Sequence, residues 1–492
     1  MSLWMASLAA LAGGSTIYVR RQPELSPLYQ LVLRHLESFV AEEEVPAFAE
    51  RALRRYLSCG VPSAGFVRVR CPESHEESLV AFSCKDRGFC PSCMSRRAAQ
   101  TAANLVDFLL PMQPLRQWVF VLPFDLHARV ARDGPLESAV LGIFIEELTT
   151  HLRTVTGSVA ASSEQEPAET GTISISQHFG SSVNLHVHWH VLGLDGVYVR
   201  DTAAAPLRFV RAPLPTVEQL EELVERVAVR VRALVGRAGP EPTLPEVQAP
   251  LLRVFGADPV EPVEPATPKL VASYDGFNLH AATAFEGHER MALERWCRYA
   301  LRGPLAASRL SLGPRDTVVY ELAKPKPDGT TQLVFPVTSF LRRLCAVMPL
   351  PRHHTLVYHG VFAAAHRWRA EVVESVPKPP QLGLCPRTKR WIDWADLLKR
   401  VWAWEVLVCS CGATRRVIAA IPAGPIAEKI LRHLRLPTKA PKLGPARLAA
   451  QMDLWDSGPP EPWDTGPPDD EFSQVPAQDD FDQSQAECEF PA

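Results

Sequence analysis

The spacing of apolar residues predicts a chain that mixes helices and strands. In 217–237, apolar side chains recur every three or four residues, as on one face of a helix. In 183–191, apolar and polar residues alternate strictly, which is typical of a strand. The run Trp118–Phe124 is apolar and is typical of a buried strand, which Pro123 would end. The same reasoning predicts further helices at 22–58, 96–110, 136–155, 286–302 and 391–407, and further strands at 172–177, 183–199, 317–323 and 331–336.

Prolines and changes of composition divide the chain. They recur every few residues in 239–268, which indicates a linker or insert, and 370–390 is also Pro-rich. Pro, Gly and Asp run through the end of the chain, which is typical of disorder. We therefore expect a helical, cysteine-rich domain at 22–110, a central domain at 111–345, an accessory domain at 346–425, a basic segment at 426–451 and a disordered acidic tail at 452–492.

The formal net charge of −3 hides an asymmetry along the chain. The tail from Met452 holds twelve Asp or Glu and no Lys or Arg, so the rest of the chain carries +9. A basic folded part with an acidic tail fits a nucleic-acid-binding protein. An enzyme of another class with a solubilising tail would show the same charges.

Apolar runs and cysteines bear on the compartment. No apolar run approaches the roughly 20 residues that a membrane-spanning helix needs. The segment Leu3–Leu11 is short, and no Lys or Arg precedes it, so we expect a cytoplasmic protein with no membrane contact. Five of the eleven cysteines fall between Cys59 and Cys93, which favours metal binding over disulfides in such a chain.

Three histidines share one face of the strand expected at 183–199. His186, His188 and His190 alternate with aliphatic residues and Trp189. Neighbours on one side of a strand lie about 6–7 Å apart, close enough for two imidazoles to share a divalent ion. The sequence therefore predicts a metal site on this strand, and three surface histidines are the alternative.

The helix expected at 286–302 carries a tyrosine outside its apolar stripe. Tyr299 lies about one turn from Arg295 and from Arg302, and next to Arg298. Guanidinium groups around a phenol would hold a phosphate and favour the phenolate that attack requires. A solvent-facing tyrosine on an ordinary amphipathic helix is the alternative.

Cysteines in the first domain predict a structural zinc. Cys90 and Cys93 form a CxxC pair, which is half of a zinc-ribbon site. Basic residues beside them, among them Lys85 and Arg87, favour a DNA-binding module. The other half of the site would be Cys71 with either His75 or Cys84, and Cys59 is a further candidate.

Two further motifs carry less information. Cys409 and Cys411 form a CxC pair with no second pair close by, which makes them weaker candidates for zinc. The sequence contains no Gly-rich phosphate loop of the GxxxxGK[ST] type, so we expect no ATP-driven chemistry.

Taken together, these residues resemble the single-tyrosine rolling-circle transposases of the His-hydrophobe-His (HUH) endonuclease superfamily, as found in bacterial insertion sequences and common-region elements. The resemblance runs from about Tyr29 to Ile421. Its pieces are, in order, FSCKDRGFCPSC (82–93), RQWVFVLPF (116–124), NLHVHWHVLGLDGVY (184–198), GFNLHAAT (276–283), RWCRYALRGPLAASRL (295–310), DGTTQLVF (328–335) and YHGVFAAAHRWRA (358–370).

The resemblance implies an α+β fold. An HUH-type antiparallel sheet with packed helices would form the catalytic domain at 111–345, with the insert 239–268 inside it. A small zinc-binding module would precede it within 22–110. The basic C-terminal region and the acidic tail would follow.

The resemblance also implies roles for the candidate residues. His188 and His190 would hold Mg²⁺ or Mn²⁺, with His186 as an extra histidine on the same face. Tyr299 would attack single-stranded or hairpin DNA at the element ends and form a 5′-phosphotyrosine. The DNA phosphates near the cleavage site would be bound by basic residues: Arg295, Arg298, Arg302, Lys85 and Arg87. A third metal ligand would be His186, His280 or His288.

The chain departs from the family's patterns at three places. Positions 295 and 303 are Arg and Gly, so one nucleophilic tyrosine is evident rather than two. Ser74 stands where a CxxC pair with Cys71 would have its second cysteine, and the C-terminal pair is CxC. The alternatives are a plasmid-type replication initiator, a non-catalytic zinc-dependent DNA-binding protein and a metal phosphodiesterase that acts on small molecules.

Overall fold

The structure is a computed structural model that describes residues 21–158, 166–202, 205–237, 270–325, 329–374 and 407–446. The expected insert at 239–268, the acidic tail at 452–492 and all but the last residue of the helix expected at 391–407 lie outside these residues.

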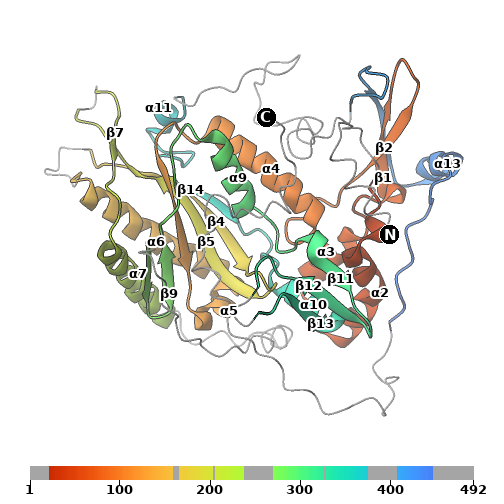
Figure 1. Ribbon diagram of the computed structural model, residues 1–492, viewed down its shortest axis with the longest axis horizontal. Coiled ribbons are helices and arrows are strands. Elements are labelled where there is room, and N and C mark those ends of the chain that lie inside the picture. The colour runs from red at the N-terminus through yellow and green to blue at the C-terminus, as the bar shows by residue number, and fades with distance from the viewer. Residues whose placement is uncertain are drawn as a thin grey trace, which may run out of the picture.

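A seven-stranded antiparallel sheet forms the centre of the molecule (Figure 1). Its order is β14-β4-β5-β3-β9-β8, and β10 pairs with β3 beside β9. The alternation along β5 and the apolar run of β3 place these two strands in the interior of the sheet. The strands are β3 (Leu115–Val121), β4 (Gly171–Phe179), β5 (Leu185–Leu194), β8 (Val271–Tyr274), β9 (Phe277–His280), β10 (Ala284–Phe285) and β14 (Leu356–Gly360).

Three helices cover one face of this sheet. They are α5 (Phe124–Arg132), α6 (Gly134–Val155) and α7 (Val217–Arg237). The side chain of Asp133 caps α6 by accepting the Leu136 N–H. The apolar stripe expected at 217–237 is buried against the strands, where Phe120 stacks between Phe144 and Trp189. This face is therefore the main hydrophobic core.

Two helices cover the opposite face. α4 (Pro91–Phe108) and α9 (Arg290–Ala300) pack on each other and on the sheet (Figure 1). Their contact residues include Leu105, Leu293 and Trp296, which meet Ile175 and Leu192 of the strands. Since strand residues alternate between faces, the even-numbered residues of β5 point toward α9.

The N-terminal part builds a second body beside the sheet. α2 (Pro27–Glu42) and α3 (Ala47–Tyr56) replace the single helix expected at 22–58, because Pro46 separates them. α10 (Val337–Ala346) packs on α2, as does a three-stranded sheet of order β11-β12-β13. Its strands are β11 (Leu310–Leu312), β12 (Thr317–Glu321) and β13 (Gln332–Pro336).

A three-stranded sheet of order β15-β1-β2 pairs a strand from the C-terminal part of the described residues with two from the N-terminal part. β1 (Gly65–Arg70) and β2 (Glu77–Ala81) form a hairpin, and β15 (Arg416–Pro422) pairs with β1 (Figure 1). α13 (Pro425–His433) packs beside it. The remaining short elements are η1 (Pro23–Leu25), η2 (Pro62–Ala64), β6 (Gly196–Val199), β7 (Arg208–Arg211), η4 (Ala307–Arg309) and α11 (Arg369–Glu374).

The sheets do not follow the expected domain boundaries. We expected 346–425 to be an accessory domain, but β14 pairs with β4 of the central sheet and β15 pairs with β1. The short helix α11 begins just before the segment expected to be a loop at 370–390 and extends into it. The basic segment expected at 426–451 contains most of α13.

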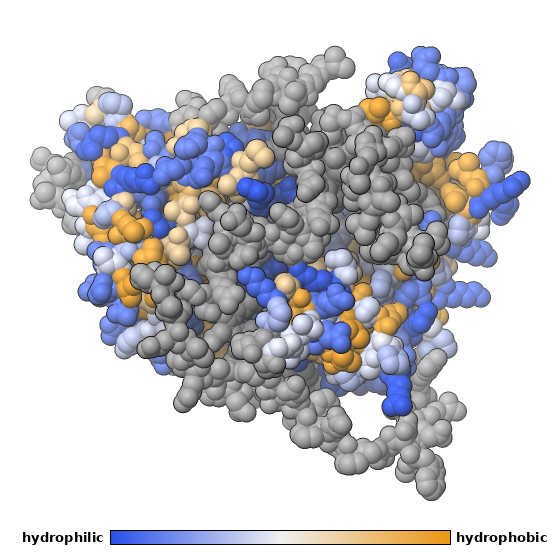
Figure 2. All heavy atoms as spheres, in the orientation of Figure 1, coloured by the Kyte–Doolittle hydropathy of each residue, from blue (hydrophilic) through white to orange (hydrophobic). Residues whose placement is uncertain are grey.

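None of the described helices is long and apolar enough to cross a bilayer. On the face shown in Figure 2, the described residues include both hydrophilic and apolar side chains, which lie interspersed.

Candidate active site

The expected histidine row exists on β5 and is buried. His188 and His190 are 2% and 4% exposed and point toward α9, whereas Trp189 packs into the core on the other face. The ring centroids of His188 and His190 are 5.0 Å apart. His186 is half-buried, and its ring lies 4.7 Å from that of His127 on α5. The α9 side of the sheet therefore holds the two adjacent imidazoles of His188 and His190, and His186 lies near the start of the same strand.

Burial keeps these imidazoles neutral. It lowers the pKa of His190 to about 3, with a smaller contribution from the charge of Arg302. It also lowers the pKa of His188 well below the usual value, with further contributions from His190 and His186. A neutral imidazole keeps the lone pair that a metal ion needs.

Hydrogen bonds give the two rings different proton positions. His188 Nδ1 lies 3.1 Å from the carbonyl oxygen of His186, which can only accept, so this Nδ1 carries the proton. His188 Nε2 then carries the lone pair that can bind a metal, and a backbone carbonyl holds the ring in place.

Consecutive hydrogen bonds between side chains hold His190 instead. Trp296 Nε1 donates to Gln117 Oε1 at 2.7 Å, which leaves Gln117 Nε2 to donate to His190 Nδ1 at 3.2 Å. Indole is a donor only, so the amide cannot be turned the other way without losing this bond. The neutral His190 ring therefore carries its proton on Nε2 in this arrangement, and ligation through Nε2 would require the contact with Gln117 to change.

The end of α9 brings Tyr299 to these histidines. The ring centroids of Tyr299 and His190 are 5.9 Å apart, and the planes make an angle of 75°. Gln177 of β4, opposite His188 in the sheet, donates to the carbonyl oxygen of Ala300 at 2.6 Å. This bond fixes the last turn of α9 onto the strand that adjoins the histidines.

The expected arginines differ in their distance from the tyrosine. Arg302 Cζ lies 4.6 Å from the centroid of the Tyr299 ring, and its Nε has no hydrogen-bond partner among the described residues. Arg302 also lines one pocket with Arg87 of the cysteine-rich segment. Arg298 is half-buried and Arg295 is exposed. Lys85 is exposed beside Arg87.

Two of the three candidate third metal ligands, His280 and His288, lie away from the histidine row. His280 is buried on β9, separated from His190 by Val119 of β3. His288 is exposed before α9. Among the described residues, no three His, Cys, Asp or Glu ligand atoms gather within 4.8 Å of one another at the histidine row.

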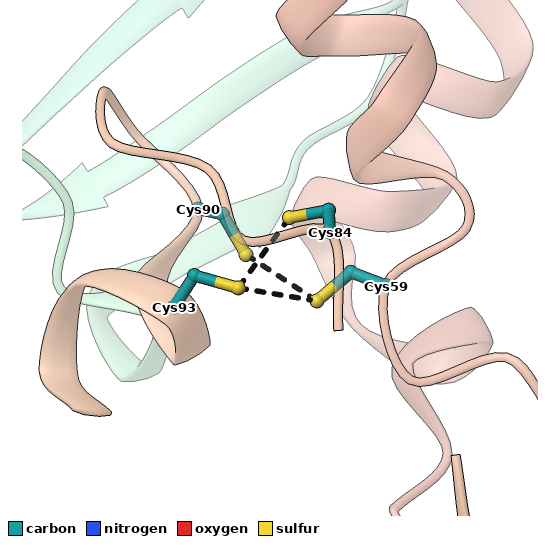
Figure 3. A group of neighbouring side chains, drawn as sticks. All are labelled: Cys59, Cys84, Cys90 and Cys93. Atoms are coloured by element: carbon teal, nitrogen blue, oxygen red, sulfur yellow. Dashed lines mark hydrogen bonds between the residues drawn. The ribbon is translucent and has the colours of Figure 1, made fainter. Parts of the chain in front are cut away.

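Four cysteines converge in the N-terminal part. The Sγ atoms of Cys59, Cys84, Cys90 and Cys93 lie within 4.8 Å of one another, and all four residues are buried (Figure 3). Neighbouring sulfurs are 3.5 to 3.7 Å apart. Zinc–sulfur bonds of about 2.3 Å give tetrahedron edges of about 3.8 Å, so the four thiolates fit a zinc ion that has no open coordination position.

Local structure holds this cluster beside α4. Asp86 Oδ2 accepts the backbone N–H groups of Gly88, Phe89 and Cys90, which shapes the turn before the helix. Arg55 of α3 donates to the carbonyl oxygen of Cys84 at 2.6 Å. The site therefore ties α3 to the first turn of α4.

Two of the expected zinc ligands are not in this cluster. Cys71 lies with Cys409 and Cys411 in a second group. His75 is exposed in the turn between β1 and β2 and belongs to neither group. Cys59, named only as a further candidate from the sequence, takes the fourth place.

Sequence reasoning also missed residues that position the site. Gln117 precedes Val119 by two residues, so the alternation of β3 could have placed it on the histidine face. Arg116 forms a buried bidentate ion pair with Asp195, with N···O distances of 2.8 and 2.9 Å. No pattern in the sequence pointed to this bond.

Two family models match the chain. Residues 31–122, which contain the four-cysteine cluster, match the model described as "Transposase zinc-binding domain". Residues 171–369, which contain the histidine row and Tyr299, match the model described as "Putative transposase". These matches support a transposase.

The two matches also bear on partners and alternatives. A transposase acts on DNA, and the zinc-binding match agrees with a structural zinc at the four buried cysteines. The matches favour neither a plasmid-type replication initiator nor a non-catalytic DNA-binding protein. No curated protein and no solved structure matches the chain.

Proposed function

We propose that this transposase nicks single-stranded DNA and transfers the strand through a 5′-phosphotyrosine at Tyr299, as rolling-circle DNA transposition requires. The observation that carries the proposal is the convergence of one phenol, two neutral imidazoles and one guanidinium on a single face of the sheet. These side chains come from β5 and from the end of α9 with the two residues that follow it, more than 100 residues further along the sequence.

Tyr299 supplies the nucleophile. Its phenolate oxygen attacks the scissile phosphorus, a Tyr299 Oη–P bond forms, and the bond from phosphorus to the 3′ oxygen breaks. The 3′ oxygen leaves and takes up a proton, so the products are a 5′-phosphotyrosine and a free 3′-OH. A second 3′-OH can reverse the step without ATP, because the covalent link retains the phosphodiester bond.

His188 and His190 would hold Mg²⁺ or Mn²⁺. The ion would polarise the scissile phosphate and neutralise developing charge. Two imidazoles leave most positions of such an ion to other ligands, which we assign to DNA phosphate oxygens and water. The fit is better for His188, whose Nδ1–H is already bound to a carbonyl.

Arg302 would bind the phosphate next to the phenol. Its Nε has no hydrogen-bond partner among the described residues, and it lines a pocket with Arg87. A phosphate there would receive charge-assisted hydrogen bonds from the catalytic helix and from the zinc-binding part together. Arg295, Arg298, Lys85 and the basic segment 426–451 would contact phosphates farther along single-stranded or hairpin DNA.

A cleavage assay tests the proposed function. The full chain is incubated with 5′- or 3′-labelled single-stranded DNA from an element end, in Mn²⁺ or in EDTA. We expect a nick that depends on the metal and is lost in Tyr299→Phe and in His188→Ala. Turnover of small phosphodiesters that survives Tyr299→Phe would favour the phosphodiesterase alternative. DNA binding without any cleavage would favour a non-catalytic DNA-binding protein.

A further inference from the structure

Three cysteines outside the four-cysteine cluster converge from opposite ends of the chain. Cys71 lies in the turn after β1, and Cys409 and Cys411 lie in the turn before β15. Their Sγ atoms are within 4.8 Å of one another, and those of Cys71 and Cys411 are 3.5 Å apart. We propose that these thiolates bind a second zinc ion and that Ser74 occupies its fourth position.

The sheet β15-β1-β2 brings the two turns together. Arg70 at the end of β1 pairs with Arg416 at the start of β15, so both turns leave the sheet at the same edge (Figure 1). In the second turn, Cys409 N–H donates to the carbonyl oxygen of Ala413, and Gly412 N–H donates to that of Cys409. Gly412 adopts φ +85°, a conformation that favours glycine. The backbone therefore places the thiols before any metal binds.

The sulfur spacing matches that of the first zinc site. Zinc–sulfur bonds of about 2.3 Å place thiolates about 3.8 Å apart. The 3.5 Å between Cys71 and Cys411 equals the shortest sulfur distance that we report in the four-cysteine cluster. A thiolate trio at this spacing prefers a soft divalent ion over Mg²⁺ or Ca²⁺.

Ser74 stands at the fourth position. Its Oγ is 3.2 Å from Cys409 Sγ, and its backbone N–H donates to Cys71 Sγ at 3.4 Å. A hydroxyl is a weaker zinc ligand than a thiolate, so the serine completes the site loosely. Glu76 also reaches Cys409 Sγ, at 3.3 Å, but the same oxygen is 2.9 Å from Arg415. We therefore assign Glu76 to the arginine.

Arg415 supplies charge compensation. Its side chain is 0% exposed, and its Nε and Nη1 have no hydrogen-bond partner among the described residues. A buried guanidinium requires negative charge nearby. Zinc with three thiolates has a net charge of −1, which would compensate this cation together with Glu76.

The two metals would differ in access. All four cysteines of the first site are buried, whereas Cys411 and Ser74 are exposed. A chelator should therefore remove the second zinc first. That zinc holds β15 and α13 against the β1–β2 hairpin, where Ala427 and Leu431 pack on Phe66 and Leu79. Its role is to fasten the C-terminal segment to the N-terminal one, and it does not depend on the proposed catalysis.

Metal analysis of the full chain, purified under reducing conditions, tests the proposal. We expect two zinc ions per chain, one of which is lost in Cys409→Ser. In Cys59→Ser the loss should fall on the other ion. In Ser74→Cys, which completes a four-thiolate site, removal of the accessible zinc by a chelator should slow at least tenfold, with Ser78→Cys on β2 as the matched control.

Several results would overturn the proposal. One zinc per chain in the wild type, or two that persist in Cys409→Ser, would exclude the site. A Cys71–Cys411 disulfide in the reduced preparation would make the pair redox-active instead. Unchanged release in Ser74→Cys would remove Ser74 from the fourth position. If Cys409→Ser fails to fold, the wild type is loaded with cobalt instead. The thiolate-to-cobalt absorption should then correspond to both cysteine groups, and absorption that corresponds to the four buried cysteines alone would exclude the second site.

Discussion

The ring centroids of His190 and Tyr299 lie 5.9 Å apart on the α9 side of the central sheet, and the two rings meet edge to face. His190 lies on β5 and Tyr299 lies on α9, and no local sequence pattern predicts that this strand and this helix pack together. Contacts of Trp296 with Gln117 and of Gln177 with Ala300 hold the helix in this position. A phenol beside a histidine row is the relationship that the proposed chemistry requires.

The proton on His190 gives the first prediction. In Gln117→Glu, one carboxylate oxygen would accept Trp296 Nε1–H and the other would accept His190 Nδ1–H. This places the imidazole proton on Nδ1 and leaves Nε2 free for metal. We expect the Kd for Mn²⁺, followed by electron paramagnetic resonance on zinc-loaded protein, to fall about tenfold.

The control for this prediction is Gln117→Met, which removes both hydrogen bonds without adding an acceptor. It should not tighten Mn²⁺ binding. Equal or weaker Mn²⁺ binding in Gln117→Glu than in the wild type would show that His190 does not ligate the ion through Nε2.

Arg302 gives the second prediction. Its guanidinium lies over the Tyr299 ring, and loss of a donor aimed at a reacting phosphate costs about 100-fold or more in rate. We expect that loss in single-turnover cleavage by Arg302→Ala. Arg302→Lys should recover only part of it, since an ammonium cannot donate in a planar fork. Arg208→Ala on β7, which is exposed, serves as the control. Full activity of Arg302→Ala would remove this residue from the site.

The buried pair of Arg116 and Asp195 gives a stability prediction. The two side chains are 5% and 3% exposed, so Asp195→Asn leaves a buried, uncompensated guanidinium. We expect the free energy of unfolding in urea to fall by about 3–5 kcal/mol. Glu146→Gln, in an exposed pair with Arg230, should cost less than about 1 kcal/mol. Similar costs for the two variants would contradict this account.

Local patterns predicted the parts of the site that depend on one element. The period of two on β5 placed His188 and His190 on one face, because alternation needs no knowledge of the neighbouring strands. The CxxC spacing likewise identified Cys90 and Cys93. The antiparallel sheet and the mixed α+β class agree with the expectation as well.

Residues that depend on distant pairing could not be predicted in this way. Cys59 joins Cys84 because α3 ends beside the turn that precedes α4. Cys71 leaves that cluster because the β1–β2 hairpin carries it to β15, about 340 residues further along the chain. Sequence spacing contains no signal for either pairing, since both depend on how separate elements pack.

The pKa of His151 gives a prediction on pH. Burial lowers it to about 4, with a smaller contribution from Arg226, whereas an unfolded histidine has a pKa near 6.5. Between these values the unfolded chain binds a proton that the folded chain does not. The contribution of the neutral His151 to the free energy of unfolding is therefore fully present above about pH 6.5. It is lost as the pH falls toward 4, and the free energy of unfolding decreases by up to about 1.4 kcal/mol per pH unit.

His151→Leu isolates this effect, because the ring packs beside Trp118 and leucine keeps an apolar contact. The difference in unfolding free energy between wild type and variant should change in favour of the variant as the pH falls from 6.5 to 4. A difference that is constant over this range would contradict the assignment of a neutral His151.

The central claim is that the phenol of Tyr299 captures the DNA. The most direct measurement is mass spectrometry of peptides from the protein after reaction with single-stranded DNA and Mn²⁺, followed by nuclease digestion. The account predicts a nucleotide attached through its 5′ phosphate to Tyr299, at a level that falls strongly in His188→Ala. A nucleotide on another residue, or cleavage with no covalent peptide, would contradict it.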